Sequence, residues 1–345
     1  MKKRIAVRIL SALMALLLLA ALCALAGCRG NADGQEKKLS VVAAVFPVYD
    51  WVKNILGDRA ESVELTLLLD SGVDLHNYQP TVDDIVKLSN CDLFIYVGGE
   101  SDGWAADALK DPRNPDRKVI NLLEVLGDAA KDEETVAGME HGDDHEDDHE
   151  EADGHEDEAG GEEGHGAEKD EHVWLSLRNA GVFCASIAAQ LASLDPDNGE
   201  TYRKNLQSYT ERLNALDGEY RTAVEAGARK TILFGDRFPF RYLADDYGLD
   251  YYAAFPGCSA ETEASFETVT FLAGRVDALG LPCVLTVDGA RHRIAQTVVE
   301  NTKDKNQPIL TMDSMQSATL ADAENGKTYL SVMQKNLEVL KTALR

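Results

Sequence analysis

The chain has 345 residues and a net charge of −26 at pH 7, because 60 Asp and Glu residues outnumber 34 Lys and Arg residues. Nucleic acid and anionic lipid surfaces repel such an acidic protein, so we exclude binding to either as its function. The length corresponds to about two domains.

Residues 1–28 are typical of a bacterial export signal. Basic residues at positions 2–4 precede Ile9–Leu25, which is almost wholly apolar. The following Gly27-Cys28 matches a lipobox, in which Cys28 is lipidated and becomes the mature N-terminus. The alternative is an uncleaved transmembrane anchor, although the polar residues after Cys28 favour cleavage. The sequence therefore predicts a lipid-anchored protein on the extracytoplasmic face of the cell membrane, with residues 29–38 as a linker.

Four cysteines remain beyond this signal, at positions 91, 184, 258 and 283. An even number outside the cytoplasm permits disulfides, but the spacing does not determine the pairing. Cys258 and Cys283 lie in the same half of the chain and are the preferred pair.

The first half of the mature chain alternates strands with helices. Apolar runs predict the strands, and Thr81 followed by Asp84 resembles a capping box at the start of a helix. The predicted strands are Leu39–Val45, Ser62–Leu69, Asp92–Val97 and Lys118–Asn121, and the predicted helices are Pro47–Leu56 and 81–90. This alternation is typical of a parallel sheet covered by helices, so residues 39–177 are predicted to form an N-terminal α/β lobe.

A segment rich in histidine and acidic residues interrupts this lobe at 139–171. Between Glu140 and Glu171 there are 17 Asp or Glu residues and one Lys, a local charge of −16. Such a segment has little apolar surface to bury, so we expect a solvated, mobile loop. Its imidazoles can chelate divalent metal weakly; the alternative is an acidic linker with incidental histidines. The predicted auxiliary ligands are His141, His145, His149, His155 and His165.

Residues 178–228 are predicted to be a helical connector. One helix extends from Arg178 to Leu194 and ends at Asp195-Pro196. A longer helix begins near Asp197. Its apolar stripe recurs at steps of three and four and consists of Tyr202, Leu206, Tyr209, Leu213, Leu216, Tyr220 and Ala223. A helix of about 30 residues is about 45 Å long, enough to cross two lobes.

Residues 229–345 repeat the alternation of strands and helices. The predicted strands are Thr231–Phe234, Tyr251–Ala254, Val284–Val287 and Ile309–Met312, and the predicted helices are 238–247, 265–279, 289–301 and 327–344. The chain is therefore predicted to contain two α/β lobes with parallel sheets, joined by one long α-helix. Ligands of such sheets bind at the carboxyl ends of the strands, here in the interlobe cleft.

Four residues with metal-binding side chains occupy such positions. Three follow predicted strands and one follows the acidic segment: His76, Asp236, Asp313 and His172. Nitrogen and oxygen ligands from different loops suit Zn²⁺ or, with more carboxylate, Mn²⁺. Taken singly each has another explanation, since an Asp after a strand commonly caps a helix.

These segments resemble the metal-specific solute-binding lipoproteins of bacterial ABC importers for zinc and manganese. The resemblance covers nearly the whole mature chain and rests on VVAAVFPVYDWVKNILGD, GVDLHNYQP, NCDLFIYVGGESDGW, the His-rich insert and EHVWLSLRNA. It implies two α/β lobes, a rigid connecting helix and a single metal buried between the lobes.

The resemblance also implies a set of ligands. The family's two histidines match His76 and His172, and its carboxylate after the last strand matches Asp313. The remaining ligand position falls on Gly235, which has no side chain. Asp236, the next residue, is the candidate for this position, and Cys258 is the alternative.

The resemblance implies a monomeric extracytoplasmic receptor that captures Zn²⁺ and delivers it to an ABC permease and its ATPase. The His-rich insert favours zinc, whereas the carboxylates leave Mn²⁺ as an alternative cargo. A surface metal-storage protein or adhesin is a second alternative. The sequence contains no P-loop motif. Its matches to HExxH (HEDDH, 145–149) and G-x-S-x-G (GESDG, 99–103) lie in the acidic segment and in the NCDLFIYVGGESDGW segment that carries the resemblance, so we expect that the chain is not an enzyme.

Overall fold

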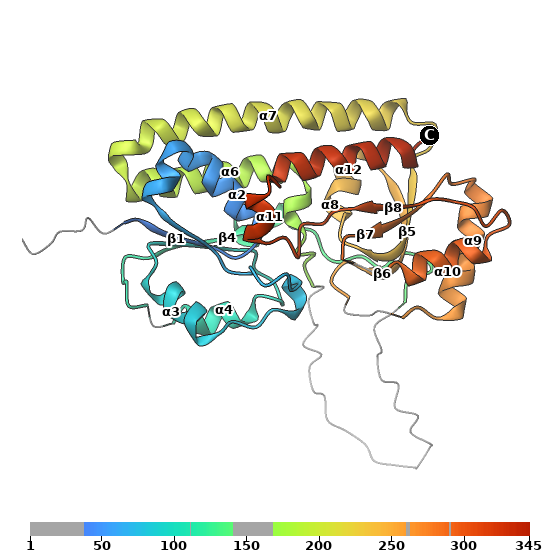
Figure 1. The fold of residues 1–345 in the computed structure, drawn as a ribbon, viewed down its shortest axis with the longest axis horizontal. Coiled ribbons are helices and arrows are strands. Elements are labelled where there is room, and N and C mark those ends of the chain that lie inside the picture. Colours follow the sequence, from blue (N-terminus) through green and yellow to red (C-terminus); the bar gives the residue numbers. More distant parts are fainter. Residues whose placement is uncertain (1–37, 111, 141–167, 260–262, 290) are drawn as a thin grey trace, which may run out of the picture. The chain divides into compact units, whose positions relative to one another are not determined.

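The computed structural model describes residues 38–110, 112–140, 168–259, 263–289 and 291–345. Within it, Leu39–Arg345 forms one compact unit that contains two four-stranded parallel sheets (Figure 1). Cys28 and the five histidines predicted as auxiliary ligands lie outside the described residues.

The first sheet has the strand order β2-β1-β3-β4. Its strands are the apolar runs of the first half, because a parallel sheet covered on both faces buries successive side chains on either side. The strands are β1 (Ser40–Ala43), β2 (Glu64–Leu67), β3 (Leu93–Tyr96) and β4 (Lys118–Asn121), and the helices are α2 (Phe46–Leu56), α3 (Val82–Asn90), α4 (Gly103–Ala108) and α5 (Leu122–Leu126). The expected capping box of α3 is present, with Thr81 and Asp84 bonding reciprocally.

The second sheet has the order β6-β5-β7-β8. Its strands are β5 (Thr231–Phe238), β6 (Asp250–Pro256), β7 (Val284–Val287) and β8 (Ile309–Met312), and its helices are α8 (Arg241–Tyr247), α9 (Phe266–Leu279), α10 (Arg293–Asn301) and α11 (Leu320–Glu324). The two sheets confirm the predicted two-lobe α/β fold.

Strand β5 differs from the prediction, because it continues to Phe238 instead of ending at Phe234. Phe234 pairs with Ala253, whereas Arg237 pairs with Phe255, so β5 contains one residue more than its partner over this interval. This bulge contains Gly235 and Asp236. The expectation that Asp236 follows the strand is therefore corrected: it lies inside the strand, at a point where a bulge redirects side chains.

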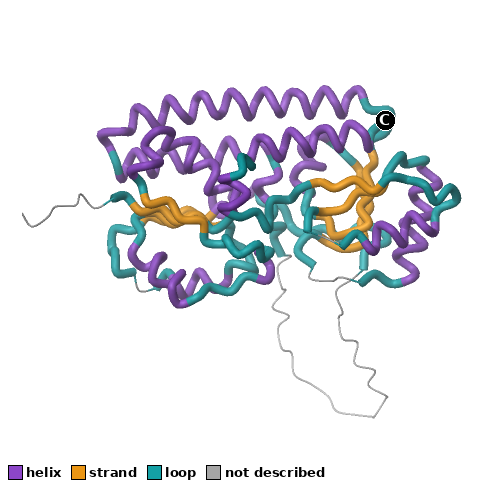
Figure 2. Tube along the Cα trace, viewed as in Figure 1, coloured by secondary structure: helices purple, strands orange, loops and turns teal. Residues whose placement is uncertain are grey.

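The long connecting helix is α7 (Gly199–Ala226), which packs beside α6 (Leu177–Leu194) (Figure 2). Its 28 residues correspond to about 42 Å. Near its start, the Asn205 side chain donates a 2.9 Å bond to the carbonyl of Ile55 in α2. Near its end, the Tyr220 hydroxyl donates a 2.6 Å bond to the carbonyl of Met333 in α12 (Tyr329–Ala343). The helix is thus fastened to both lobes, as expected of a rigid connector.

One hydrophobic core contains side chains from both lobes. At its centre the Trp51 ring lies 5.7 Å from that of Phe183 in α6 and 5.2 Å from that of Tyr329 in α12, measured between centroids. Because this core is shared, Leu39–Arg345 is one compact unit, within which the boundaries at 177/178 and 228/229 stay a prediction. Among the helices of the described residues, none has the length and apolarity needed to span a bilayer.

Asp50 is buried in this shared core, and its environment predicts a pH-dependent stability. Burial raises its pKa to about 6, although the backbone N–H of Tyr329 donates a 3.1 Å bond to its carboxylate. The unfolded value is about 3.9, so the folded state binds more protons between these values and its stability falls as pH rises through this window. We therefore expect the free energy of unfolding of Asp50→Asn, taken relative to that of the wild type, to increase by roughly 2–3 kcal/mol when the pH is raised from 4 to 7. Denaturant unfolding at both pH values tests this; a constant difference would contradict it.

Candidate metal centre

His76 lies in the loop between β2 and α3, in the single turn Leu75–Asn77. Asp74 caps this turn by accepting a 3.1 Å bond from the backbone N–H of His76. Leu75 is fully buried and anchors the turn, and the His76 side chain is 6% exposed. The local fold therefore holds the imidazole in the interior.

His172 is fully buried at the point where the chain returns from the His-rich segment. Its Nδ1 atom lies 2.9 Å from Oδ1 of Asp170. The backbone of Gly257 packs against the ring so closely that a Cβ there would lie 3.1 Å from Nδ1. The same Cβ would lie 2.9 Å from the carbonyl oxygen of Phe238, so glycine at this position avoids crowding both the backbone and the imidazole.

The two imidazoles face each other, with 3.2 Å between their Nε2 atoms. Tetrahedral Zn²⁺ with Zn–N bonds of about 2.0–2.1 Å places two nitrogen ligands about 3.3 Å apart, so the observed spacing fits one shared metal ion. The Nδ1 atom of His172 must carry the proton, since its carboxylate partner can only accept. Its Nε2 atom is therefore an acceptor, and the Gln316 amide nitrogen lies 2.8 Å from it.

The Nδ1 atom of His76 lies 2.7 Å from the Ser101 hydroxyl and 3.5 Å from Oε2 of Glu171. The nearby carboxylate favours a proton on Nδ1, which leaves the Nε2 lone pair free. Burial is the main cause that lowers the pKa of His76, and the neighbouring His172 adds to it. The Nδ1 atoms of both imidazoles are thus held by hydrogen-bonding partners, as in carboxylate–histidine–metal sites.

Cys258 completes the cluster. Among the described residues, His76, His172 and Cys258 offer ligand atoms that all lie within 4.8 Å of one another. Cys258 follows β6, and its backbone N–H donates a 2.8 Å bond to Glu133. Burial raises the pKa of its thiol, with Asp170 and Glu133 adding to the effect, so a metal must displace the thiol proton.

The predicted carboxylates Asp236 and Asp313 are not part of this cluster. Asp236 accepts hydrogen bonds from the Thr286 hydroxyl, at 2.7 Å, and from the backbone N–H of Val287, at 3.1 Å. Asp313 forms a 2.8 Å ion pair with Lys327. The structure thus brings two of the four predicted ligands together and gives the other two different partners.

Gly235 also has a structural role. A Cβ at this position would lie 2.5 Å from the Cα atom of Ala295 in α10. The absence of a side chain therefore allows α10 to pack directly on the bulged strand.

Besides Asp170, Ser101 and Glu171, three further residues near the histidines were missed by the sequence analysis. Gln316 places its amide nitrogen 2.8 Å from Nε2 of His172 and 3.4 Å from Oδ1 of Asp74. Asp74 is also ion-paired with the guanidinium of Arg237. Asp74 and Gln316 lie two and three residues from the predicted ligands His76 and Asp313, and this proximity was the only available signal.

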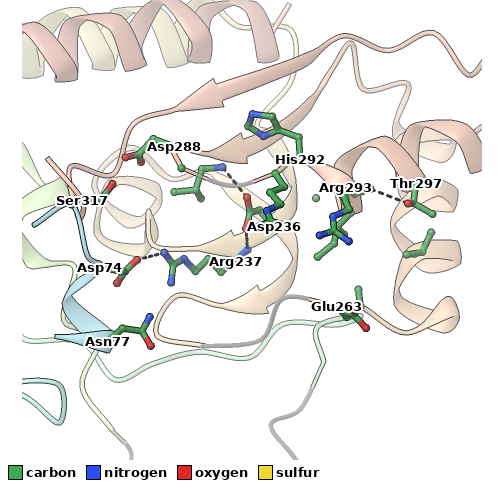
Figure 3. Close-up of a pocket in the computed structure, with 18 residues that line it drawn as sticks. Asp74, Asn77, Asp236, Arg237, Glu263, Asp288, His292, Arg293, Thr297 and Ser317 are labelled. Atoms are coloured by element: carbon green, nitrogen blue, oxygen red, sulfur yellow. Dashed lines mark hydrogen bonds and ion pairs between the residues drawn. The ribbon is translucent and has the colours of Figure 1, made fainter. Parts of the chain in front are cut away.

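A cleft of about 860 Å³ opens beside Asp74 and Arg237 (Figure 3). Its first-lobe wall contains Gly72, Asp74 and Asn77. The second-lobe wall contains the following charged or polar residues among others: Asp236, Arg237, Asp288, Arg291, His292 and Arg293. The predicted interlobe cleft is therefore present and reaches Asp74, whereas His76, His172 and Cys258 are not among the residues that line it.

The preferred disulfide is absent from the structure. Cys258 lies at the histidine pair and Cys283 is buried just before β7, and no disulfide joins them. This prediction was wrong because sequence proximity does not determine whether two Cβ atoms face each other.

The ZnuA family model, described as "Zinc-uptake complex component A periplasmic", matches residues 41–343. The chain belongs to the ZnuA family. This membership confirms the resemblance seen in the sequence, and a family of uptake components agrees with the expectation that the chain is not an enzyme.

Two curated relatives match over most of this ZnuA family chain. The zinc-binding lipoprotein AdcA of Streptococcus pneumoniae is 31% identical over 327 residues, which cover 94% of this chain and 60% of AdcA. The high-affinity zinc uptake system protein ZnuA of Bacillus subtilis is 29% identical, and the match covers 95% of this chain and 94% of that protein. The chain thus spans about 60% of the length of AdcA and nearly all of the Bacillus protein.

Solved structures have the same fold. The Zn(II)-bound ZnuA-like domain of S. pneumoniae AdcA superimposes with a TM-score of 0.65 at 26% identity, covering 89% of this chain and 99% of the domain. The metal-dependent lipoprotein YcdH of B. subtilis gives a TM-score of 0.68 at 25% identity, covering 89% of this chain and all of YcdH.

Proposed function

We propose that this protein is a receptor that captures Zn²⁺ outside the cytoplasm and delivers it to an ABC importer. The observation that carries the proposal is the pair of buried imidazoles whose Nε2 atoms lie 3.2 Å apart. This spacing matches that of two nitrogen ligands on one tetrahedral zinc ion. The names of the relatives AdcA and ZnuA, a zinc-binding lipoprotein and a zinc uptake protein, support zinc as the cargo.

We propose that His76, His172 and Cys258 bind the metal. A fourth ligand can come from Gln316, because rotation of its amide would present Oε1 instead of nitrogen to the site. Asp313 and Asp236 can contribute only after leaving Lys327 and Thr286, respectively. Two imidazoles and a thiolate are softer than the carboxylates that suit Mn²⁺, so this ligand set favours zinc over the manganese alternative.

Metal analysis tests this proposal directly. Residues 29–345, which lack the predicted signal and Cys28, should retain one equivalent of zinc after purification without added metal. Competition with a chromophoric chelator should then show one tight zinc site and weaker manganese binding. A chain that holds no tight zinc, or that prefers manganese under the same conditions, would contradict the proposal.

The His-rich segment is proposed to collect zinc separately from the tight site. The structure fixes its borders, since Glu140 bonds to Ala254 and Asp170 bonds to Lys131 and His172. We therefore expect that replacing residues 141–167 with a Gly-Ser linker removes several weak zinc equivalents and leaves one tight equivalent. We expect these sites to be weak, because ordering a charged segment with little apolar surface around an ion costs conformational entropy.

The matched control for this linker variant keeps the length and charge of the segment and changes its five histidines to asparagine. Zinc stoichiometry by calorimetry should fall equally in both variants. If the linker variant lost the tight zinc equivalent and the asparagine variant kept it, the segment would be shown to support the main site.

The anchor and the partners are also proposals. Lipidation at Cys28 would hold the receptor, as a monomer, on the extracytoplasmic membrane face beside the permease and its ATPase. We expect Cys28→Ser to abolish labelling by a palmitate analogue, because the thiol that carries the lipid is absent. Unchanged labelling would contradict the lipobox. If cells need this protein to grow when zinc is scarce, it delivers zinc; a protein that only stores metal or acts as an adhesin would not be needed.

A further inference from the structure

The ion pair between Arg237 and Asp74 places a permanent positive charge beside the proposed metal centre. The bulge in β5 directs Arg237 toward the first lobe, and its guanidinium contacts Oδ2 of Asp74 (Figure 3). The two side chains are 20% and 14% exposed, so water screens this pair only in part. Arginine keeps its charge at any physiological pH, so this charge cannot be removed by loss of a proton.

The other oxygen of Asp74 connects this pair to the metal centre. Oδ1 of Asp74 lies 3.9 Å from Nε2 of His76, the atom proposed to bind zinc. It also accepts a 3.4 Å hydrogen bond from the Gln316 amide, which contacts His172. A single carboxylate thus separates the guanidinium from the metal-binding nitrogen.

The guanidinium of Arg237 repels any cation bound at Nε2 of His76, because only the Asp74 carboxylate lies between them and the pair is mostly buried.

We propose that Arg237 acts as a resident cation that competes with Zn²⁺ for Asp74 and thereby limits the affinity of the site. This inference rests on the proposed function of the same site. In the metal-free protein the guanidinium neutralises Asp74. When zinc binds, the Asp74 carboxylate turns toward the metal, and the guanidinium moves into the adjoining cleft, which has space for it. The resulting loss of the ion pair makes zinc binding weaker and its release easier.

The test compares the zinc affinity of the wild type, Arg237→Gln and Arg237→Lys, each measured by competition with a chromophoric chelator. Removing the charge should tighten binding by about tenfold or more, because Asp74 is then free to balance the metal. The lysine variant keeps the charge and should stay within about threefold of the wild type. Thermal unfolding of the metal-free variants checks that each one is folded.

A second pair of variants tests whether Arg237 acts through Asp74. In an Asp74→Asn background, the Arg237→Gln change should no longer tighten binding, so the two changes are non-additive. Unchanged or weaker zinc binding in Arg237→Gln, beside a wild type that binds zinc tightly, would overturn the inference. A wild type without a tight zinc site would instead overturn the proposed function, so the two failures are distinguishable.

Discussion

Replacing either His76 or His172 with alanine is expected to raise the zinc dissociation constant by more than about 100-fold. Loss of a residue that merely orients a metal ligand costs about 10- to 100-fold in affinity, and loss of the ligand itself costs more. Both side chains are almost completely buried, and His172 is fully so. The vacated position is therefore poorly replaced by bulk water. Competitive titration of residues 29–345 measures the change.

The matched control for these variants is His292→Ala. His292 lines the cleft beside Asp74 and Arg237, contacts Thr286 and lies outside the cluster formed by His76, His172 and Cys258. Its loss should leave the zinc dissociation constant within about threefold of the wild type. If His76→Ala or His172→Ala also retains wild-type affinity while folding normally, the proposed metal centre is wrong.

The same titration examines Asp236 and Asp313. Asparagine can accept the hydrogen bonds that Asp236 receives from Thr286 and Val287, so Asp236→Asn should preserve the fold. We expect Asp236→Asn and Asp313→Asn each to change zinc affinity by less than about fivefold, because both carboxylates are bound elsewhere. A steep loss in either variant would show that its carboxylate turns toward the metal when zinc binds.

Replacing Cys258 with serine is expected to weaken zinc binding by about 10- to 100-fold and manganese binding much less, which narrows the preference for zinc. A thiolate is a soft ligand that favours zinc, whereas a serine hydroxyl is hard and stays protonated. In the wild type, the metal must displace a thiol proton whose pKa is raised by burial. Zinc binding should therefore release a proton that the serine variant lacks.

Two measurements check the role of Cys258. Calorimetry in buffers of different ionisation enthalpy counts the released protons. Substitution with Co²⁺ should give a thiolate-to-metal charge-transfer band in the wild type and in Cys283→Ser, a matched control with a buried cysteine outside the cluster. A band that persists in Cys258→Ser would show that Cys258 is not a ligand.

The sequence by itself determined the architecture and the histidine pair. Continuous apolar runs alternate with helical patterns, and only a parallel sheet covered on both faces buries such runs. The stripe from Tyr202 to Ala223 predicted one long helix, and Tyr202, Tyr209, Leu213, Leu216 and Tyr220 are buried in α7. The pattern is local, so each element could be read without knowing its neighbours. His76 and His172 were found because each lies in a distinctive motif next to an ordered segment.

Only the tertiary structure decided which other groups surround those histidines. The one-residue bulge in β5 keeps Asp236 inside the sheet and directs Arg237 toward Asp74. Such a register shift depends on pairing with β6, which leaves no periodic signal in the sequence. Gln316 meets His172 across 144 positions of sequence, and their contact depends on how the two lobes pack. The sequence specifies elements through local periodicity, whereas a metal centre is assembled from loop ends whose distances are set by the packing of the whole chain.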